Sequence, residues 1–583
     1  MSDLGERLRT AREDKGVPLE EIAEATRIPL YYLRALEEET FDVFTCELHA
    51  RGFLRIYAGF LGLDPNEILS LYGQQHPHPP ASRQVPLPVA NVPASPGRSF
   101  SGVDALLGLV VLALVALAAL SVYQRRSNVQ PIAIASPAPT PTVTPMPIFE
   151  GTAYTLDVSL NYAEHTLRAR ERIDYTNTVS KTLNDLMLNI HANCSRGTFK
   201  LNSVKVETEG KWVQPEVYPL DMTLRVQLPQ PLPPNKHVAL SLEFELNLPK
   251  INPEAEFSQA SLGYSRRALS LGNWYPVLAP YRQDKGWYGL TCFEIGDPYV
   301  TEVADYQVTI TTTHEVEIAA TGRGTRSGNR WSYEAQQARS FALAASDQYQ
   351  VRTTQIGGTT VHSYYFPNNQ EAGEAALQTA VQAIELFTEL YGPYPYTDYR
   401  IAETEFAGGM EFSGLTFLGS VFYDEYDGTT RTPLIPLTAH EVAHQWFYGL
   451  VGNDQVIEPW LDEALAEYSG YLYYERYLPD DADWWWFYAV DQWAPTGKID
   501  SFIYEFRDNR QYLDAVYRRG AQFVHHLRQA MGDSGFFAFL QEYPRRYAYR
   551  LVKSRDFFRL VQEFSTVDLI PLQEEYFRQR ILP

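Results

Sequence analysis

Two histidines with a glutamate between them stand at a spacing that can hold a metal ion. Residues 440–444 read His-Glu-Val-Ala-His. On a helix, positions four apart project from one face, so His440 and His444 can bind the same zinc ion. Taken alone, the pattern is also compatible with a helix that carries two unrelated histidines.

A third ligand is predicted at Glu463, in the helical stretch WLDEALAEY that begins after a turn. If this helix runs antiparallel to the first, its carboxylate reaches the metal. Structural zinc sites are closed by four protein ligands, whereas three ligands leave a position for water. One zinc ion held by His440, His444 and Glu463 therefore indicates hydrolysis, with Glu441 as the general base that takes a proton from the attacking water.

The pattern HEVAH, eighteen residues before Glu463 and preceded by GGMEFSG at 408–414, resembles the aminopeptidase N family of gluzincin metallopeptidases. The segments DPYVTEVADYQVTI and GPYPYTDYRI extend the resemblance over residues 150 to 583. The resemblance implies a β-rich domain, then a mainly helical, thermolysin-like catalytic domain that removes N-terminal residues from peptides. Whether the enzyme is an exopeptidase is less firmly implied than hydrolysis itself.

The resemblance also assigns substrate-binding residues. In that family a glutamate of the Gly-x-Met-Glu-Asn motif grips the free amino group of the substrate, and the matching position is Glu411, behind Gly408, Gly409 and Met410. An ordinary surface carboxylate is the alternative. Phe412 replaces the asparagine of the motif, and we expect it to alter the edge of the pocket.

A tyrosine ahead of a basic residue and a glycine stabilises the oxyanion in that family. The segment AVYRRGAQFVHHL supplies Tyr517, with Arg519 in place of the usual lysine. A phenol aimed at developing negative charge can contribute a few kcal/mol. His525 and His526, close by in the same segment, are expected to be structural.

The sequence departs from the family pattern in two ways. The second residue that binds the amino terminus has no clear counterpart, because Gly272, Asn273 and Trp274 in the corresponding segment offer no carboxylate. The large C-terminal helical domain of longer relatives is also expected to be absent, which would leave the site more open.

The elements that must position these residues change character along the chain. In YTLDVSLN, apolar residues alternate from Tyr154 to Leu160, which is the period of a half-buried strand. From Asn369 the period becomes helical. The prediction is a multidomain α+β protein, with a β-rich domain at 150–352 and the zinc catalytic domain at 353–583.

A single membrane anchor is predicted upstream of these domains. Residues 105–123 read ALLGLVVLALVALAALSVY, nineteen residues without a charge, which is long enough to cross a bilayer. We place the transmembrane helix at 104–124, between proline-rich linkers at 74–103 and 125–149. The basic residues that flank it are balanced, so charge alone leaves the orientation open.

Residues 1–73 show helical periodicity with Gly and Pro breaks, the layout of a small all-α helix-turn-helix bundle. These residues hold 14 Asp and Glu against 8 Lys and Arg, and the formal charge of the whole chain is -22. DNA phosphates repel such a surface, which argues against a DNA-binding function.

The stretches RIPLYYLRALEEETFDVF and HARGFLRIYAGFLGLDPNEI resemble the cytoplasmic domain of the bacterial RodZ family of cytoskeleton anchors. The resemblance implies a single-pass protein of a bacterial cytoplasmic membrane, with the N-terminus in the cytoplasm and the peptidase outside it. It also implies a cytoskeletal partner, which Phe53 and Tyr57 would contact. Packing of both rings in the core of the module is an equally open alternative.

The three cysteines, Cys46, Cys194 and Cys292, are too few for a disulfide scaffold or a thiolate zinc site. A pair between Cys194 and Cys292 is conceivable if their domain lies outside the cytoplasm. The expected function is a membrane-anchored zinc aminopeptidase that acts on peptides. A non-catalytic peptide receptor or scaffold, and a membrane-tethered DNA-binding regulator, are the alternatives.

Overall fold

The structure is a computed structural model that describes residues 3–26, 28, 30–41, 47–75, 151–251, 261–406 and 408–582. The predicted transmembrane helix at 104–124, the linker at 125–149 and the linker at 74–103 beyond Gln75 lie outside these residues. Within the described ranges, no helix combines the length and the hydrophobicity that crossing a membrane requires.

The N-terminal module is helical, as its periodicity predicts. Its helices are α1 (Asp3–Lys15), α2 (Leu19–Thr26), α3 (Leu30–Glu38), α4 (Glu47–Leu61) and α5 (Pro65–Gln75). Its core is built from the apolar stripe of each helix, among them Leu4, Leu8, Ile22, Leu33, Leu36 and Leu54.

The prediction that Phe53 and Tyr57 form a partner-binding surface is wrong for this structure. Both side chains are buried in the core of the module. The Tyr57 hydroxyl donates a hydrogen bond to Glu37 (2.5 Å), and the Phe53 ring packs 5.2 Å from that of Tyr32. Their four-residue spacing places them on the inward face of α4, where the core fixes them.

The β-rich region is built on an eight-stranded sheet with the order β16-β17-β14-β1-β2-β8-β4-β5. The strands alternate buried and exposed residues, as the sequence predicts for β1, and β1 pairs antiparallel with β2 and parallel with β14. Their bounds are β1 Thr152–Asn161, β2 Thr166–Thr176, β4 Phe199–Thr208, β5 Lys211–Val213, β8 His237–Asn247, β14 Ala304–Thr312, β16 Arg323–Ser327 and β17 Arg330–Ala338.

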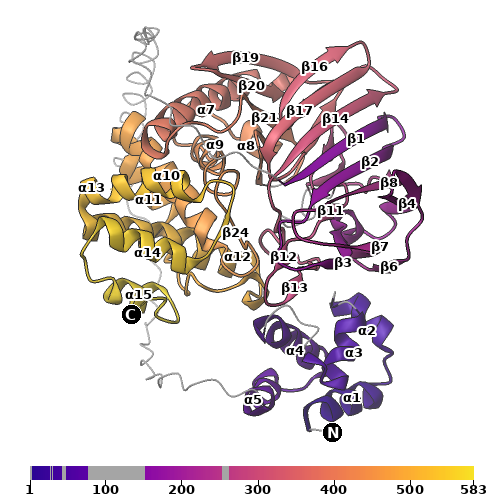
Figure 1. The fold of residues 1–583 in the computed structure, drawn as a ribbon. Coiled ribbons are helices and arrows are strands. Elements are labelled where there is room, and N and C mark those ends of the chain that lie inside the picture. The colour runs from indigo at the N-terminus through magenta and orange to yellow at the C-terminus, as the bar shows by residue number, and fades with distance from the viewer. Residues whose placement is uncertain are drawn as a thin grey trace, which may run out of the picture. The chain divides into compact units, whose positions relative to one another are not determined.

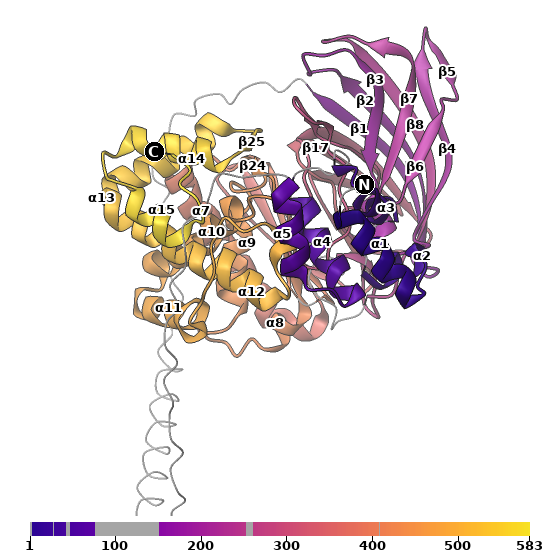
Figure 2. The same ribbon diagram turned by 90° about the horizontal axis from the view of Figure 1, so that it is seen from below.

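Two four-stranded sheets, with the orders β11-β3-β7-β6 and β15-β18-β10-β9, and the two-stranded sheet β12-β13 complete this region. Side chains from the eight-stranded sheet and both four-stranded sheets share one apolar core, and Figure 2 shows β3, β7 and β6 lying over the larger sheet. The bounds are β3 Leu183–Asn189, β6 Val217–Leu220, β7 Thr223–Leu232, β9 Leu262–Tyr264, β10 Leu269–Leu271, β11 Val277–Leu278, β12 Tyr281–Arg282, β13 Gly286–Trp287, β15 Glu317–Ala320 and β18 Leu343–Ser346.

The structure joins Cys194 and Cys292 in a disulfide, with the two Cα atoms 5.5 Å apart. The sequence leaves this pair open. The bond ties the short helix η2 (His191–Cys194) to the segment that follows β13.

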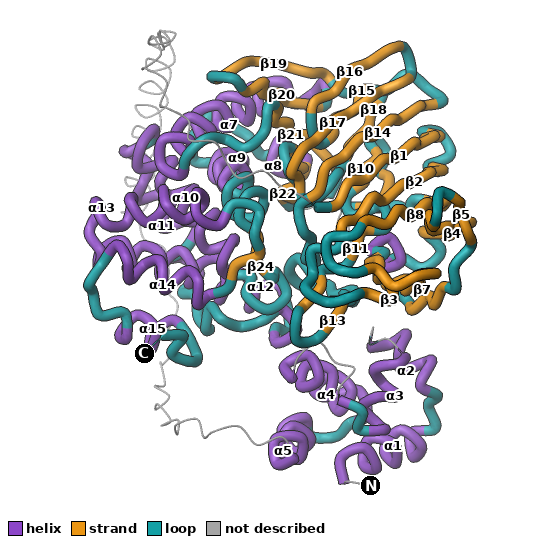
Figure 3. The backbone as a smooth tube through the Cα atoms, viewed as in Figure 1, coloured by secondary structure: helices purple, strands orange, loops and turns teal. Residues whose placement is uncertain are grey.

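The catalytic region begins with a five-stranded sheet of order β19-β20-β21-β23-β22, which the prediction of a mainly helical domain does not include. Its strands are β19 Gln350–Ile356, β20 Thr359–Tyr365, β21 Asp398–Thr404, β22 Gly409–Phe412 and β23 Leu415–Gly419. Figures 1 and 3 show α7 (Gln370–Tyr391) lying along this sheet, with α9 between α7 and α10.

Helices make up most of the remaining catalytic region. They are α8 Ser420–Asp424, α9 Leu434–Ala443, α10 Trp460–Tyr477, α11 Ala482–Ala489, α12 Asn509–Tyr512, α13 Arg519–Tyr547, α14 Ser554–Phe564 and α15 Ile570–Tyr576, with a short pair of strands, β24 Gly452–Asn453 and β25 Leu551–Val552. One large apolar core, which includes Trp446 and Trp460, holds these helices together.

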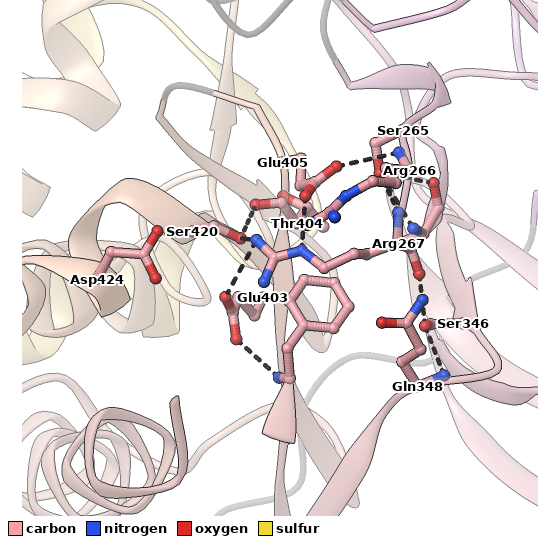
Figure 4. Close-up of polar contacts among 12 residues, drawn as sticks. Ser265, Arg266, Arg267, Ser346, Gln348, Glu403, Thr404, Glu405, Ser420 and Asp424 are labelled. Carbon is pink, nitrogen blue, oxygen red and sulfur yellow. Dashed lines mark hydrogen bonds and ion pairs between the residues drawn. The ribbon is translucent and has the colours of Figure 1, made fainter. Parts of the chain in front are cut away.

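Arg267 joins the β-rich region to the residues that follow β21 and β23 of the five-stranded sheet (Figure 4). Its Nε donates to Glu405 Oε1 (2.6 Å) and its Nη2 donates to Ser420 Oγ (3.0 Å). The guanidinium lies 4.0 Å from the ring centre of Phe366. Because Glu405 directly follows β21, these contacts fix the start of the connection that leads to β22.

Candidate active site

The three predicted ligands converge. The Nε2 atoms of His440 and His444 lie 3.0 Å apart, and the Oε2 atom of Glu463 lies 3.4 Å from the first and 3.3 Å from the second. The histidines project from the end of α9 and the glutamate from the first turn of α10. All three side chains are buried.

The two distances to Glu463 fit a tetrahedral cation, and the two ring nitrogens lie a few tenths of an ångström closer. Bonds of about 2.0 to 2.2 Å at the tetrahedral angle place ligand atoms about 3.3 to 3.5 Å apart. Glu463 Oε2 is buried and has no hydrogen-bond partner within the described part of the chain. A shared ion would satisfy that oxygen and would explain why two ring nitrogens face each other.

Neighbouring groups orient both imidazoles. His444 Nδ1 lies 2.9 Å from the carbonyl oxygen of Phe447, which favours a proton on Nδ1 and leaves Nε2 to bind the metal. His440 Nδ1 lies 2.9 Å from the carboxylate of Glu467, one helical turn after Glu463. Sequence analysis did not single out Glu467, although a carboxylate behind a ligating histidine is a common arrangement.

The electrostatics of the cluster favour a bound cation. Burial opposes charge on His440, but the carboxylates of Glu463 and Glu467 raise the pKa of this histidine to about 10. Burial alone would raise the pKa of Glu463, yet His444 and His440 lower it to about 2. The carboxylates in this pocket thus stabilise positive charge, which a divalent metal ion supplies.

The Glu441 side chain points toward β22. A Cβ atom at Gly409 would lie 1.9 Å from Glu441 Oε1, so only glycine leaves room for this carboxylate. Burial, with a further contribution from Glu411, raises the pKa of Glu441 to about 8. A carboxylate with a pKa near neutrality can both accept a proton and release it again, as a base that later acts as an acid requires.

The strand β22 carries the predicted substrate-binding residues. Gly408, Gly409, Met410 and Glu411 line the same cavity as the metal ligands. Gln455 Nε2 donates to Glu411 Oε1 (3.2 Å) and to Asp462 Oδ2 (2.9 Å), which fixes the glutamate beside the first turn of α10. Burial raises the pKa of Glu411.

Asp297 is a site residue that sequence analysis missed. It lies in the connection after β13, yet one of its oxygens is within 4.8 Å of oxygens of Glu411 and Glu463. Gly296 has a φ of +68°, and a Cβ atom there would lie 3.0 Å from the Tyr512 ring, so the backbone passes close to the catalytic helices. The quoted segment DPYVTEVADYQVTI begins with this aspartate, but nothing in its local sequence marks it as a cavity residue.

Gly272, Asn273 and Trp274, in the segment that corresponds to the family's second residue for binding the amino terminus, do not line the cavity. Trp274 is fully buried in the core of the β-rich region, and its indole nitrogen donates to the carbonyl oxygen of Phe341. A Cβ atom at Gly272 would lie 2.4 Å from the Phe412 ring. Phe412 is itself buried and packs against Phe417, so it does not line the cavity, contrary to the expectation that it alters the pocket edge.

Tyr517 lies on a π-helical turn, η8 (Leu513–Arg518), and its ring stacks on His440 at 5.7 Å. Such turns are frequent at functional sites. Burial and Glu463 raise the pKa of Tyr517 well above the ordinary value, so its hydroxyl stays protonated and can donate. Gly520 allows the chain after Tyr517 to pack closely against α10, because a Cβ atom at Gly520 would lie 2.6 Å from that of Ala464.

The remaining residues of this motif lie apart from the metal ligands. Arg519 packs over the Tyr576 ring at 4.3 Å. His525 Nδ1 lies 3.1 Å from the Tyr468 hydroxyl, and His526 Nδ1 lies 2.7 Å from that of Tyr576. These contacts match the structural role expected for both histidines.

The site opens into a cavity of about 260 Å³. Carboxylates, the two histidines and Arg518 line part of it, and the other lining side chains are apolar or aromatic and include Phe422, Leu437, Trp485, Tyr488 and Trp493. The arrangement can hold a divalent cation, a positively charged group and an apolar group in one cavity.

Residues 375–576 match the family model described as Peptidase family M1 domain, and residues 7–68 match the one described as Helix-turn-helix domain. The first match contains the three candidate metal ligands, Glu441 and Tyr517. These matches support the predicted resemblance of the C-terminal region to the aminopeptidase N family and the predicted helix-turn-helix module.

Curated relatives are similar over the same part of the chain. "Aminopeptidase M1-B" of Oryza sativa subsp. japonica is 27% identical over 248 residues, which are 40% of this chain and 28% of the rice protein. "Endoplasmic reticulum aminopeptidase 1" of Mus musculus is 25% identical over 39% of this chain and 26% of its own length. The matched part thus spans under a third of these relatives.

Solved structures match over a longer stretch. The M1 zinc metallopeptidase from Deinococcus radiodurans aligns with a TM-score of 0.52 and 19% identity, over 75% of this chain and 96% of that one. A mutant of the same enzyme bound to a Tyr-Ser-Ala substrate aligns with a TM-score of 0.53 and 19% identity, over 74% of this chain and 96% of that one. At this identity the likeness establishes the fold.

Proposed function

We propose that this protein is a zinc metallopeptidase that removes N-terminal residues from peptides. The observation that carries the proposal is the convergence of His440, His444 and Glu463 to within 3.4 Å of one another, with Glu441 one residue along α9. Three ligands leave one coordination position for a reactant, as in hydrolytic zinc sites. The family match and the named relatives agree with this function.

Zinc bound here would polarise the scissile carbonyl and acidify a water molecule. Glu441 accepts the proton of the attacking water and later transfers it to the leaving amine. Tyr517, protonated and stacked on His440, donates a hydrogen bond to the oxygen that becomes negative. The carboxylates of Glu411 and Asp297 hold the charged amino group and set where the chain is cut.

This pair of carboxylates distinguishes an aminopeptidase from a general endopeptidase. An ammonium ion between two buried carboxylates gains charge-assisted hydrogen bonds, which an internal peptide bond cannot form. Peptides with a blocked amino terminus should therefore be poor substrates.

The proposal is tested with the full-length chain in detergent micelles and fluorogenic aminoacyl substrates. We expect turnover that a chelator removes and that zinc restores. Glu441→Gln should lower kcat by a factor on the order of 10² to 10⁴. A folded, zinc-loaded protein without chelator-sensitive turnover, or one in which Glu441→Gln retains full activity, would refute the enzymatic function.

We also propose that residues 104–124 anchor the protein in a bacterial cytoplasmic membrane, with the peptidase outside the cytoplasm. The uncharged run at 105–123 and the resemblance of residues 1–125 to the RodZ family support the anchor and its orientation. The disulfide between Cys194 and Cys292 agrees with an oxidising compartment. Protease treatment of intact spheroplasts should digest the peptidase and spare the N-terminal module; the reverse pattern would invert the orientation.

A further inference from the structure

The cavity continues past the metal ligands into an apolar space. We call this space the aromatic chamber and define it by Phe422, Leu437, Trp485, Tyr488 and Trp493. Helix α11 and the short helix η6 (Asp491–Trp493) supply its aromatic wall, and α9 supplies Leu437. None of these residues has a part in the proposed catalytic steps.

The aromatic chamber lies at the opposite end of the site from the amino-group carboxylates. An oxygen of Glu411 lies within 4.8 Å of a ring nitrogen of His444, at the end of α9, and of an oxygen of Asp462, at the start of α10. The chamber lies beside the earlier turns of α9 and the later turns of α10. A Cβ atom at Gly470, the α10 residue that lines it, would lie 3.7 Å from the Pro436 carbonyl oxygen and 3.4 Å from the Trp485 indole nitrogen.

The separation is large enough to place two different residues of a substrate. Asp462 and Gly470 are about 12 Å apart along α10, at 1.5 Å per residue. The metal ligand Glu463 lies between these positions, as does Glu467, which is 2.9 Å from His440 Nδ1. If Glu411 and Asp297 hold the amino group and the first carbonyl reaches the zinc site, the residue after the scissile bond enters the chamber.

Contacts with neighbouring residues fix the aromatic wall before a substrate arrives. The Trp493 ring lies 4.7 Å from the guanidinium of Arg510 and 4.3 Å from that of Arg518, and its indole nitrogen donates to the Tyr488 carbonyl oxygen. The Tyr488 ring stacks on Trp484 with centres 4.9 Å apart. A rigid apolar wall loses little entropy when it binds a side chain.

The charged groups nearest the chamber have partners of opposite charge. Arg518 donates to Asp514 (2.6 Å), which also accepts from Arg510 (2.8 Å), and Glu467 lies 2.9 Å from His440 Nδ1. An apolar side chain therefore gains contact without separating an ion pair. A carboxylate in the same place would lose water and would have to compete with Asp514 for Arg518.

We infer that this protein selects its substrates by the second residue, the one that follows the scissile bond, and that large apolar and above all aromatic side chains are preferred there. The inference rests on the proposed aminopeptidase function and adds a substrate class to it. It assigns the aromatic chamber as the subsite for that residue.

The test uses full-length protein in micelles with the peptides Ala-Xaa-Ala-amide, where Xaa is Phe, Leu, Gly or Asp. Release of the first alanine is followed by mass spectrometry. We expect kcat/KM for Phe to exceed that for Gly about tenfold or more, as apolar pockets discriminate by such factors, and Asp to be the poorest. Equal values for Phe and Gly, or a preference for Asp, would overturn the inference.

Variants of Trp493 test whether the aromatic chamber causes the preference for Phe over Gly. Trp493→Ala should lower the ratio of kcat/KM for Phe to that for Gly toward one, and Trp493→Phe should keep most of it. The matched control is Phe487→Ala on α11, because the Phe487 side chain is 58% exposed and does not line the cavity. An unchanged ratio in Trp493→Ala would refute the subsite.

The two proposals fail in different ways. If alanine is released from every peptide at the same rate, the substrate preference fails and the aminopeptidase function stands. If no peptide and no aminoacyl fluorogenic substrate is cleaved by the zinc-loaded protein, both fail. The unmodified chain alone decides between these outcomes, so the test does not depend on whether Trp493→Ala folds.

Discussion

Asp297 and Glu411 bring carboxylate oxygens to within 4.8 Å of each other, although one follows β13 of the β-rich region and the other lies on β22 of the catalytic region. Both are buried, and burial together with Glu411 raises the pKa of Asp297 well above its ordinary value. Two acids kept this close in a dry site repel each other when both are ionised. A bound ammonium group relieves that repulsion.

Asp297→Asn should therefore weaken the binding of peptides that have a free amino terminus. Loss of one charge-assisted hydrogen bond costs about 1.5 to 3 kcal/mol, or about a tenfold to hundredfold rise in KM for unblocked peptides. The measurement is kcat and KM with Ala-Phe-Ala-amide. Glu294→Gln, at an exposed carboxylate three residues away, is the control, and an equal effect in both variants would remove Asp297 from the site.

Gly409→Ala tests the room around the general base. Its new methyl group would overlap Glu441 Oε1, so the carboxylate must move away from the attacking water. We expect kcat to fall by about a hundredfold or more while KM changes less, since a displaced base affects the chemical step. Gly358→Ala, in the turn between β19 and β20 with open space around it, should retain the wild-type values. A fully active Gly409→Ala would show that Glu441 is not the base.

Residues that act within one helix could be predicted from the sequence, and those that meet across the fold could not. The pair His440 and His444 follows from helical spacing alone, and Glu463 needs only one further helix. Asp297 reaches the site through a connection without regular structure, so no period in the sequence points to it. Its position depends on how β13 and the catalytic helices are packed.

The five-stranded sheet escaped prediction for a related reason. All seven residues of β21 are buried although four of them are polar, so neither a continuous apolar run nor alternation along the whole strand marks it in the sequence. Tyr57 is a second residue whose position the sequence does not decide. An aromatic residue on an amphipathic helix can face a partner or its own core, and here the bond to Glu37 belongs to the core.

Metal removal should destabilise the protein. A ligand that binds only the folded state stabilises it by about 4 kcal/mol at a thousandfold excess over Kd, and two histidines and a carboxylate provide such a site. We expect a chelator to lower the unfolding temperature of the catalytic region and zinc to restore it. His444→Ala should unfold at a lower temperature that the chelator no longer changes. A chelator-insensitive wild-type protein would argue against a resident metal ion.

Glu171 offers a test of stability away from the active site. It lies on β2 between Leu156 of β1 and Leu242 of β8, is fully buried, and neither carboxylate oxygen has a hydrogen-bond partner within the described residues. Burial raises its pKa well above the ordinary value of 4.5. An unpaired buried polar group costs about 1 to 3 kcal/mol, so Glu171→Leu should be more stable than the wild type.

The contribution of Glu171 to the free energy of unfolding depends on pH, and the sign of this dependence can be worked out. Below pH 4.5 the carboxyl is protonated in the folded and unfolded chains alike, and its ionisation contributes nothing. As the pH rises above 4.5, only the unfolded chain releases the proton freely, so this group lowers the free energy of unfolding until the pH reaches the raised folded-state pKa. The stability gain of Glu171→Gln should therefore grow from pH 4.5 upward, as measured by chemical denaturation. Glu243→Gln, at a half-exposed position of β8, should show no such trend, and a gain in Glu171→Gln that does not vary with pH would mean that Glu171 is ionised in the folded protein.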